Sequence, residues 1–176
     1  IMIRFTPGIE CHTHEYIRTG SFDSKFGFGI EYLNILFANI RDTKHLKLTG
    51  IHAHIGSQIF ELDPHNDLGE IMVNVILEAK EFGHNIDELN VGGGLGIKYT
   101  ESDDPPSIDE WVKTISNSVV KACEKNNLDF PTLMCEPGRS IVSTAGITIY
   151  KIGAFKEIPG IRTVSYTHLT LPTSVI

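Results

Sequence analysis

Short apolar segments alternate with amphipathic stretches along this chain, and this alternation limits the possible folds more than any other feature. Four segments are rich in apolar side chains and stop near glycine or proline, at residues 2–5, 48–55, 88–91 and 132–135. Their length and their flanking residues predict buried β-strands. Between them, apolar residues at helical spacing predict helices over 30–40, 68–82 and 107–122. Repeated strand–helix units predict a parallel sheet with helices outside it, either a barrel or a doubly wound sheet.

The third predicted helix has the clearest start signal. Ser107 and Glu110 match a capping box directly after Pro105 and Pro106, a motif in which each side chain accepts a hydrogen bond from the other residue's backbone N–H. The second predicted helix ends at Gly83, a common residue just beyond a helix. Apolar residues follow the capping box at helical spacing, at Trp111, Ile115, Val119 and Ala122.

The length of the chain bears on its domain organisation. It has 176 residues, whereas a complete eight-unit barrel typically takes about 250. Four strand–helix units amount to half of such a barrel, and because the chain opens inside a predicted strand, we expect further sequence upstream. Residues 164–176 resemble a translated sequencing-library adaptor, so we expect a non-native tail there and exclude it from the fold.

Charge and cysteine content narrow the class of partner. The formal net charge is −7 without a basic patch or an arginine-rich helix, which argues against nucleic acid and anionic membranes as partners. Cys11, Cys123 and Cys135 are too few and too scattered for a disulfide framework or a Cys-x-x-Cys metal site. No apolar run approaches the length of a membrane span, and we expect no signal peptide. We therefore expect a cytoplasmic protein with a small-molecule partner.

Polar residues gather where two of the predicted strands end. His52 and His54 lie at the end of the second strand and point to the same side, because strand side chains alternate. The fourth strand stops at Pro137 and Gly138, which separate Glu136 from Arg139. The carboxyl ends of parallel strands are where barrels and open α/β folds bind their ligands. The sequence therefore predicts a ligand site at this edge, with an ion pair in an exposed loop as the alternative for Glu136 and Arg139.

Three consecutive glycines, Gly92, Gly93 and Gly94, follow the third predicted strand. Such a run is costly in backbone entropy, and its usual use is a turn whose N–H groups face an anion such as phosphate. The dinucleotide-binding pattern Gly-x-Gly-x-x-Gly with a downstream acidic residue is not satisfied. We therefore predict a site for a single phosphate group, with a purely structural tight turn as the alternative.

Taken together, these groups suit pyridoxal 5′-phosphate. We predict that Glu136 hydrogen-bonds the pyridine nitrogen and keeps it protonated, which makes the ring an electron sink. His54 is expected to stack on the ring, and Ser57 to donate a hydrogen bond to the phosphate. Arg139 is expected to hold an anion, either the phosphate or a substrate carboxylate, through the bidentate geometry of its guanidinium.

Four motifs extend this interpretation to a known family. They are Ser-Phe-Asp-Ser-Lys-Phe-Gly at 21–27, His-Ile-Gly-Ser-Gln-Ile at 54–59, Gly-Gly-Gly-Leu-Gly-Ile at 92–97 and Glu-Pro-Gly-Arg at 136–139. In order and spacing they resemble the motifs of the diaminopimelate decarboxylase family, which belongs to the fold-type III pyridoxal phosphate decarboxylases. Gln58 is distinctive, because ornithine and arginine decarboxylases of this fold usually carry glycine there.

The resemblance implies a fold and a reaction. Residues 1–140 would be the C-terminal half of a (β/α)8 barrel of the alanine racemase type, and residues 141–163 the start of a C-terminal β-domain. The implied protein is a homodimer. The implied reaction removes the carboxylate at the D-centre of meso-2,6-diaminopimelate and yields L-lysine, the last step of lysine biosynthesis.

The resemblance also implies the roles of individual residues. Arg139 would bind phosphate or substrate, while the lysine that attaches the cofactor would lie upstream of Ile1 and the acidic cysteine beyond residue 163. We therefore expect no catalytic residue on this chain, which would be inactive alone, and we expect Lys25 to be structural and Cys135 to be a core residue. The implied cofactor contacts are His54, Ser57, Gly92, Gly93, Gly94, Glu136, Pro137, Gly138 and Arg139.

Three alternatives remain at this stage. An ornithine- or arginine-type decarboxylase of the same fold is the closest. A non-catalytic barrel that carries pyridoxal phosphate is the second, although it would not need the β-rich continuation after residue 140. The third is a metal-dependent barrel amidohydrolase, in which the pairs His12/His14 and His52/His54 would hold Zn²⁺. It would also need a later histidine and an aspartate at further strand ends, which we do not find in place.

Overall fold

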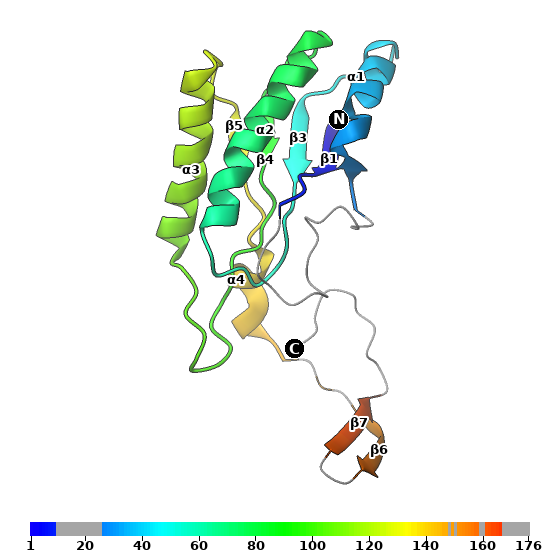
Figure 1. Cartoon of the computed structure of the whole chain (residues 1–176), viewed down its shortest axis with the longest axis vertical. Helices are drawn as coiled ribbons and strands as arrows, with labels where there is room; N and C mark the ends of the chain where they lie inside the picture. Colours follow the sequence, from blue (N-terminus) through cyan, green and yellow to red (C-terminus); the bar gives the residue numbers. More distant parts are fainter. Residues whose placement is uncertain (10–25, 148, 150, 159–160, 167–176) are drawn as a thin grey trace.

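A parallel five-stranded sheet with helices along one face forms the main part of the molecule (Figure 1). The computed structural model describes residues 1–9, 26–147, 149, 151–158 and 161–166. The strand order is β2-β1-β3-β4-β5, and β6 pairs with β7 in a separate antiparallel pair. The strands are β1 (Met2–Thr6), β2 (Phe28–Gly29), β3 (Gly50–Ala53), β4 (Glu88–Asn90), β5 (Thr132–Met134), β6 (Ile152–Ile158) and β7 (Ile161–Tyr166).

The four predicted strands are all present and pair in parallel. Arg4, His52, Asn90 and Met134 are register partners across β1, β3, β4 and β5, so they form one row across the sheet. The predicted strand at 48–55 is shorter than expected, since β3 covers Gly50–Ala53. The sequence did not predict β2, whose two residues pair with the outer edge of β1. A segment of this length is too short to show the alternation by which strands are recognised.

Three helices cover one face of the sheet and confirm the predicted strand–helix alternation (Figure 1). They are α1 (Leu33–Arg41), which follows the 3-10 turn Ile30–Tyr32, α2 (Asp63–Glu81) and α3 (Ile108–Lys125). The capping box is confirmed, because the Ser107 and Glu110 side chains both accept hydrogen bonds from the other residue's backbone N–H. Gly83 follows the C-cap of α2 with φ +86°, a left-handed conformation that favours glycine.

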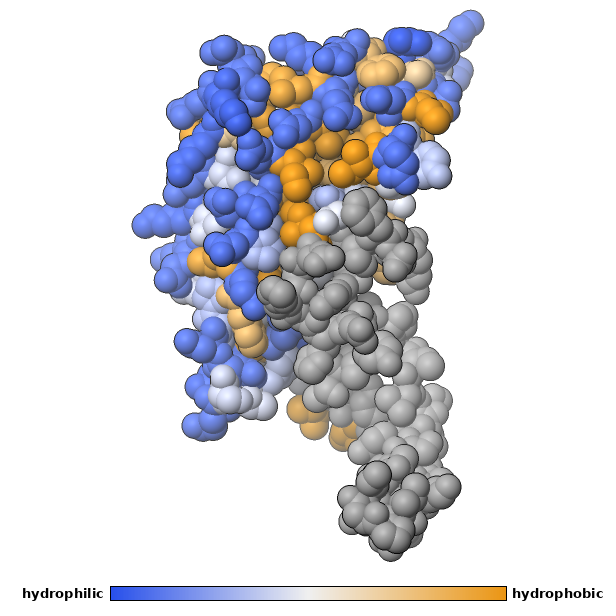
Figure 2. All heavy atoms as spheres, viewed as in Figure 1, coloured by the Kyte–Doolittle hydropathy of each residue, from blue (hydrophilic) through white to orange (hydrophobic). Residues whose placement is uncertain are grey.

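The core lies between this face of the sheet and the helices. Alternate strand residues point into it, and Phe5, Ile51 and Leu89 are each at most 1% exposed. From the helices, Phe37, Met72 and Trp111 are equally buried. The outer surface over the helices is mostly hydrophilic, with hydrophobic residues visible between hydrophilic ones (Figure 2). Burial of these side chains is the main source of stability of the unit.

The close approach of α2 and α3 depends on a small residue. A Cβ at Gly69 would lie 2.7 Å from the Cβ of Ser118 on α3, closer than non-bonded carbon atoms approach. The hydroxyl of Ser118 donates a hydrogen bond back across the helix pair, to the carbonyl of Asn66. Close packing at Gly69 and this hydrogen bond therefore both hold α2 against α3.

The chain after β5 changes from parallel to antiparallel structure. A short helix, α4 (Gly138–Val142), is followed by the 3-10 turn Ser143–Ala145 and then by the β6–β7 pair. The domain boundaries at 140 and 163 stay predictions. Residues 10–25, with Cys11, His12, His14 and Lys25, lie outside the described residues, as does most of the expected tail, 167–176. Within the described part of the chain, no helix has the length and apolar character needed to cross a membrane.

Candidate functional site

The segments that follow β3, β4 and β5 meet at the carboxyl edge of the sheet and are held together by backbone hydrogen bonds. Ile59 N–H donates to the Gly94 carbonyl at 2.9 Å, and Gly96 N–H donates to the Ile59 carbonyl at 3.0 Å. On the other side, Glu136 N–H donates to the Gly92 carbonyl at 2.6 Å. The three strand-end segments that carry the predicted site residues therefore form one connected edge.

Gln58 fastens the first of these segments to the second. Its side-chain amide donates to the Ile97 carbonyl at 2.7 Å and accepts from the Ile97 N–H at 3.1 Å. Gln58 itself has φ 58°, a conformation that is strained for most residues other than glycine. The paired hydrogen bonds offset that strain. In the structure, Gln58 therefore fixes the segment that carries Ser57.

The glycine turn is packed against its neighbours on both sides. Gly92 and Gly94 have φ +67° and +111°, and a Cβ on Gly93 would overlap the carbonyl oxygen of Glu136. Two of the three N–H groups already have protein acceptors, since Gly92 N–H donates to Asn90 Oδ1 at 2.9 Å and Gly93 N–H to His54 Nδ1 at 3.1 Å. The three glycines thus have a structural cause of their own, and their contact with a phosphate stays a prediction.

Glu136 and Arg139 contact different partners. Glu136 Oε1 accepts a hydrogen bond from Asn90 Nδ2 at 2.8 Å, and its Oε2 lies 3.7 Å from His52 Nε2. Among the ion pairs of the described residues, none joins Glu136 to Arg139. The alternative of an ion pair within the loop is therefore not what this structure shows. The start of α4 at Gly138 separates the two side chains.

Arg139 connects all three segments. Its Nε and Nη2 donate to the hydroxyl oxygen of Ser57 at 3.0 and 2.9 Å, and its Nη1 donates to the Tyr99 hydroxyl at 2.6 Å. The guanidinium also lies 5.7 Å from the centre of the Tyr99 ring, within reach of a cation–π interaction. Because Ser57 accepts from the guanidinium, its own O–H is left to donate elsewhere. The sequence had not singled out Tyr99, whose only signal is an aromatic residue shortly after the glycine run.

The histidines at the end of β3 are held neutral. Burial lowers the pKa of His54 to about 4, with smaller contributions from Arg4 and His52 that Glu136 partly offsets. Burial also lowers the pKa of His52, again against the attraction of Glu136. Since His54 Nδ1 accepts from Gly93, the proton of the neutral ring resides on Nε2. His54 is therefore an uncharged, oriented ring at neutral pH.

The structure corrects the predicted burial of Cys135 and bears on the metal-site alternative. Cys135 was expected in the core but is exposed, because β5 is the last strand of the sheet and has a neighbour on one side only. The described residues contain no group of three or more His, Cys, Asp and Glu side chains able to hold a metal ion. His12 and His14, which the metal hypothesis requires, lie outside the described residues.

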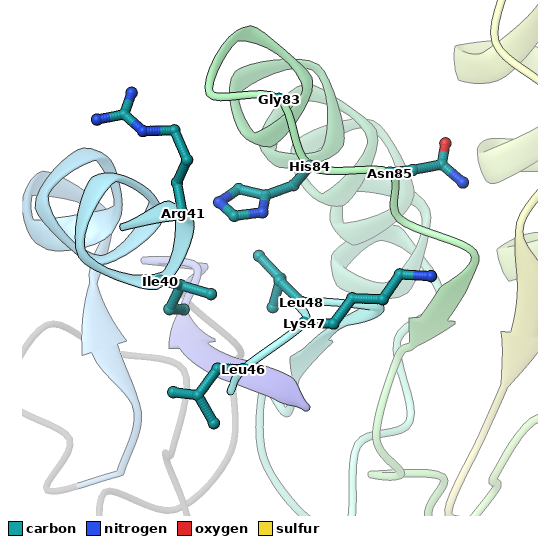
Figure 3. Close-up of a pocket in the computed structure, with 8 residues that line it drawn as sticks. All are labelled: Ile40, Arg41, Leu46, Lys47, Leu48, Gly83, His84 and Asn85. Carbon is teal, nitrogen blue, oxygen red and sulfur yellow. The ribbon is translucent and has the colours of Figure 1, made fainter. Parts of the chain in front are cut away.

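A separate pocket lies at the opposite end of the sheet, near the start of β3 (Figure 3). None of the predicted site residues lines it. Among its lining residues, His84 Nε2 lies 2.9 Å from the Phe37 carbonyl oxygen, and Asn85 Nδ2 donates to Asp87 Oδ1 at 2.6 Å. The lining residues are Ile40, Arg41, Leu46, Lys47, Leu48, Gly83, His84 and Asn85.

Sequence comparison finds diaminopimelate decarboxylases among the relatives of this chain. The chain is 55% identical over 163 residues to a diaminopimelate decarboxylase of Synechocystis sp., an alignment that covers 93% of this chain and 35% of that protein. A diaminopimelate decarboxylase of Staphylococcus aureus is 42% identical over 164 residues, with 92% of this chain and 38% of that protein covered. The chain therefore spans between 35% and 38% of the length of these two relatives.

Structure comparison agrees with the sequence relatives. A crystal structure of diaminopimelate decarboxylase from Helicobacter pylori complexed with L-lysine has a TM-score of 0.74 and 30% identity, and the match covers 94% of this chain and 40% of that one. The arginine decarboxylase of Paramecium bursaria Chlorella virus, with a TM-score of 0.59 and 20% identity over 93% of this chain and 40% of that one, shows the shared fold alone.

The family model that describes the pyridoxal-binding domain of pyridoxal-dependent decarboxylases matches residues 1–143. This match, together with the structural neighbours, confirms the predicted fold class, a parallel α/β unit of the barrel domain of these enzymes. It also agrees with the predicted cofactor. The chain belongs to the pyridoxal-dependent decarboxylase family, as part of its pyridoxal-binding domain.

Proposed function

We propose that the protein containing this chain decarboxylates meso-2,6-diaminopimelate to L-lysine with pyridoxal phosphate. The observation that carries the proposal is the 55% identity to a diaminopimelate decarboxylase over 93% of the chain. The sequence motif adds support at Gln58, where ornithine and arginine decarboxylases of this fold usually carry glycine. The proposed protein acts in the cytoplasm as a homodimer.

The residues at the site fit pyridoxal phosphate in kind. A hydroxyl that is free to donate is present at Ser57, next to the positive charge of Arg139, and such groups suit a phosphate. A neutral imidazole at His54 suits the face of a ring. A carboxylate at Glu136, held by Asn90, suits a protonated ring nitrogen.

When bound, pyridoxal phosphate accepts the electron pair that remains on the substrate's α-carbon as carbon dioxide leaves. In the proposed arrangement, Glu136 holds a proton at the ring nitrogen, and this charge-assisted hydrogen bond is worth roughly 1.5–3 kcal/mol. His54 would stack on a face of the ring. Ser57 donates to the phosphate, while Arg139 orients Ser57 and adds positive charge near the anion. A substrate carboxylate is the alternative anion for Arg139.

The test is lysine formation by the full-length gene product that contains this chain. We expect lysine from meso-diaminopimelate, no reaction with ornithine or arginine, and loss of activity in Glu136→Ala. Glu124→Ala is the matched control, since Glu124 is an exposed residue of α3. Decarboxylation of ornithine or arginine instead would favour the related decarboxylases. A protein that binds the cofactor but decarboxylates none of the three would favour a carrier, and a protein that binds no cofactor would contradict the proposal.

We further propose that the 176-residue chain alone does not catalyse the reaction. The family resemblance assigns the lysine that attaches the cofactor and the acidic cysteine to sequence outside it. Activity of the isolated chain at the rate of the full-length product would contradict this assignment.

A further inference from the structure

Asn90 connects the two parts of the site that the sequence treated as independent. It is the last residue of β4 and is 8% exposed. Its side-chain oxygen accepts from Gly92 N–H at 2.9 Å, and its side-chain nitrogen donates to Glu136 Oε1 at 2.8 Å. One amide group therefore joins the glycine turn to the carboxylate proposed for the cofactor nitrogen.

The orientation of this amide is determined by its partners. Gly92 N–H requires an acceptor, which places Oδ1 toward the turn and leaves the NH₂ group for Glu136. Few side chains of this length carry both an acceptor for Gly92 N–H and a donor for Glu136. An ionised aspartate has no donor, and leucine has neither a donor nor an acceptor.

The other charged or titratable groups near Glu136 do not take over this contact. His52 Nε2 lies 3.7 Å from Oε2, which is too long for a hydrogen bond. Arg4 on β1 and His54 beyond β3 interact with Glu136 through charge rather than through a hydrogen bond. Within the described part of the chain, Asn90 is thus the side chain that fixes the rotation of the Glu136 carboxylate.

We propose that Asn90 is a positioning residue for the cofactor, which holds the Glu136 carboxylate at the angle that meets the ring nitrogen while anchoring the glycine turn. The proposal rests on the proposed function. Asn90 does not touch the reacting atoms. It acts through Glu136 on one side and Gly92 on the other, so that the nitrogen and phosphate ends of the ligand are placed by a single side chain.

The first test measures the dissociation constant of pyridoxal phosphate by absorbance titration of the full-length product. We expect Asn90→Ala to weaken binding about tenfold or more, the equivalent of one hydrogen bond to a charged group. Asn74→Ala is the control, because Asn74 is an exposed residue of α2, and it should leave the constant within about twofold. Equal binding by wild type and Asn90→Ala would overturn the proposal.

The second test separates positioning from a merely structural role. Asn90→Asp keeps the acceptor for Gly92 but sets a second carboxylate against Glu136, and two carboxylates in contact share a proton more readily as the pH falls. We expect binding by Asn90→Asp, relative to wild type, to recover about tenfold between about pH 8 and about pH 5.5, as the shared proton restores the donor. A ratio that does not change with pH would overturn the proposal.

These outcomes separate the two proposals. If wild type itself does not bind the cofactor, the proposed function fails and the role of Asn90 fails with it. If wild type binds and both Asn90 variants bind equally well at every pH, only the role of Asn90 is overturned. If Asn90→Ala does not fold, the pH dependence of Asn90→Asp decides, because that variant keeps the contact with the glycine turn.

Discussion

The two faces of the sheet perform different tasks, although their residues alternate along the same strands. Ile51 and Leu89 point toward the helices and are 1% and 0% exposed. The next residues, His52 and Asn90, lie on the opposite face and contact Glu136. Burial stabilises the fold on the first face, and on the second it lowers the pKa of His52 and His54. A shift of one residue in register would exchange core for site.

The largest expected effect tests the helix-covered face. Trp111 is 1% exposed and Val112, its neighbour on α3, is 43% exposed. We expect Trp111→Ala to lower the free energy of unfolding by about 3–5 kcal/mol, because a large buried side chain leaves a cavity. Val112→Ala should cost less than about 1 kcal/mol. Urea denaturation of the full-length product measures both, and equal costs would contradict the division between core and surface on this helix.

His65 and Trp111 place polar ring nitrogens in the otherwise apolar core on the helix-covered face of the sheet. His65 is fully buried on α2, and its ring meets that of Trp111 edge-on at 5.5 Å. Neither ring nitrogen of His65 has a hydrogen-bond partner among the described residues. Burial lowers the pKa of His65 from 6.5 to about 4. Below pH 6.5 the unfolded chain therefore binds a proton that the folded chain does not, and stability falls until the pH passes about 4.

The second prediction follows from this imidazole. His65 is expected to cost on the order of 3 kcal/mol of stability at the acid end of this window. His65→Phe should therefore reduce the loss of stability between pH 6.5 and about pH 4, measured by denaturation at a series of pH values. His45→Gln is the control, since His45 is exposed. Parallel stability curves for wild type and His65→Phe would show that His65 is not the group responsible.

The elements that could be predicted are those with local causes. The capping box of Ser107 and Glu110 involves residues three positions apart, so the sequence contains the whole signal. The alternation of Ile51 with His52 likewise lies within one strand. The predicted strands and helices are therefore present, whereas β2, with two residues, has no pattern of its own.

The contacts that could not be predicted join segments about 40 residues apart. Gln58 reaches Ile97, and Asn90 reaches Glu136, only because the strand ends converge. The motifs identified the residue types of the site but not which of them contact each other. Glu136 and Arg139 illustrate this limit of the sequence motifs. They are close in sequence, yet α4 begins between them and Arg139 contacts Ser57 instead of Glu136.

The smallest effect concerns Tyr99, which the sequence did not identify. Tyr99→Phe removes the 2.6 Å hydrogen bond from Arg139 but keeps the ring beside the guanidinium, whereas Tyr99→Leu removes both. Because Tyr99 is exposed, we expect Tyr99→Phe to weaken binding of the anion held by Arg139 by about 1 kcal/mol, and Tyr99→Leu to weaken it somewhat more. The constant that changes identifies the anion that Arg139 binds. A higher dissociation constant for the cofactor indicates the phosphate. A higher KM with unchanged cofactor binding indicates the substrate carboxylate. Tyr32→Phe, at another exposed tyrosine, is the control. If neither Tyr99 variant changes either constant, Ser57 alone is sufficient to orient Arg139.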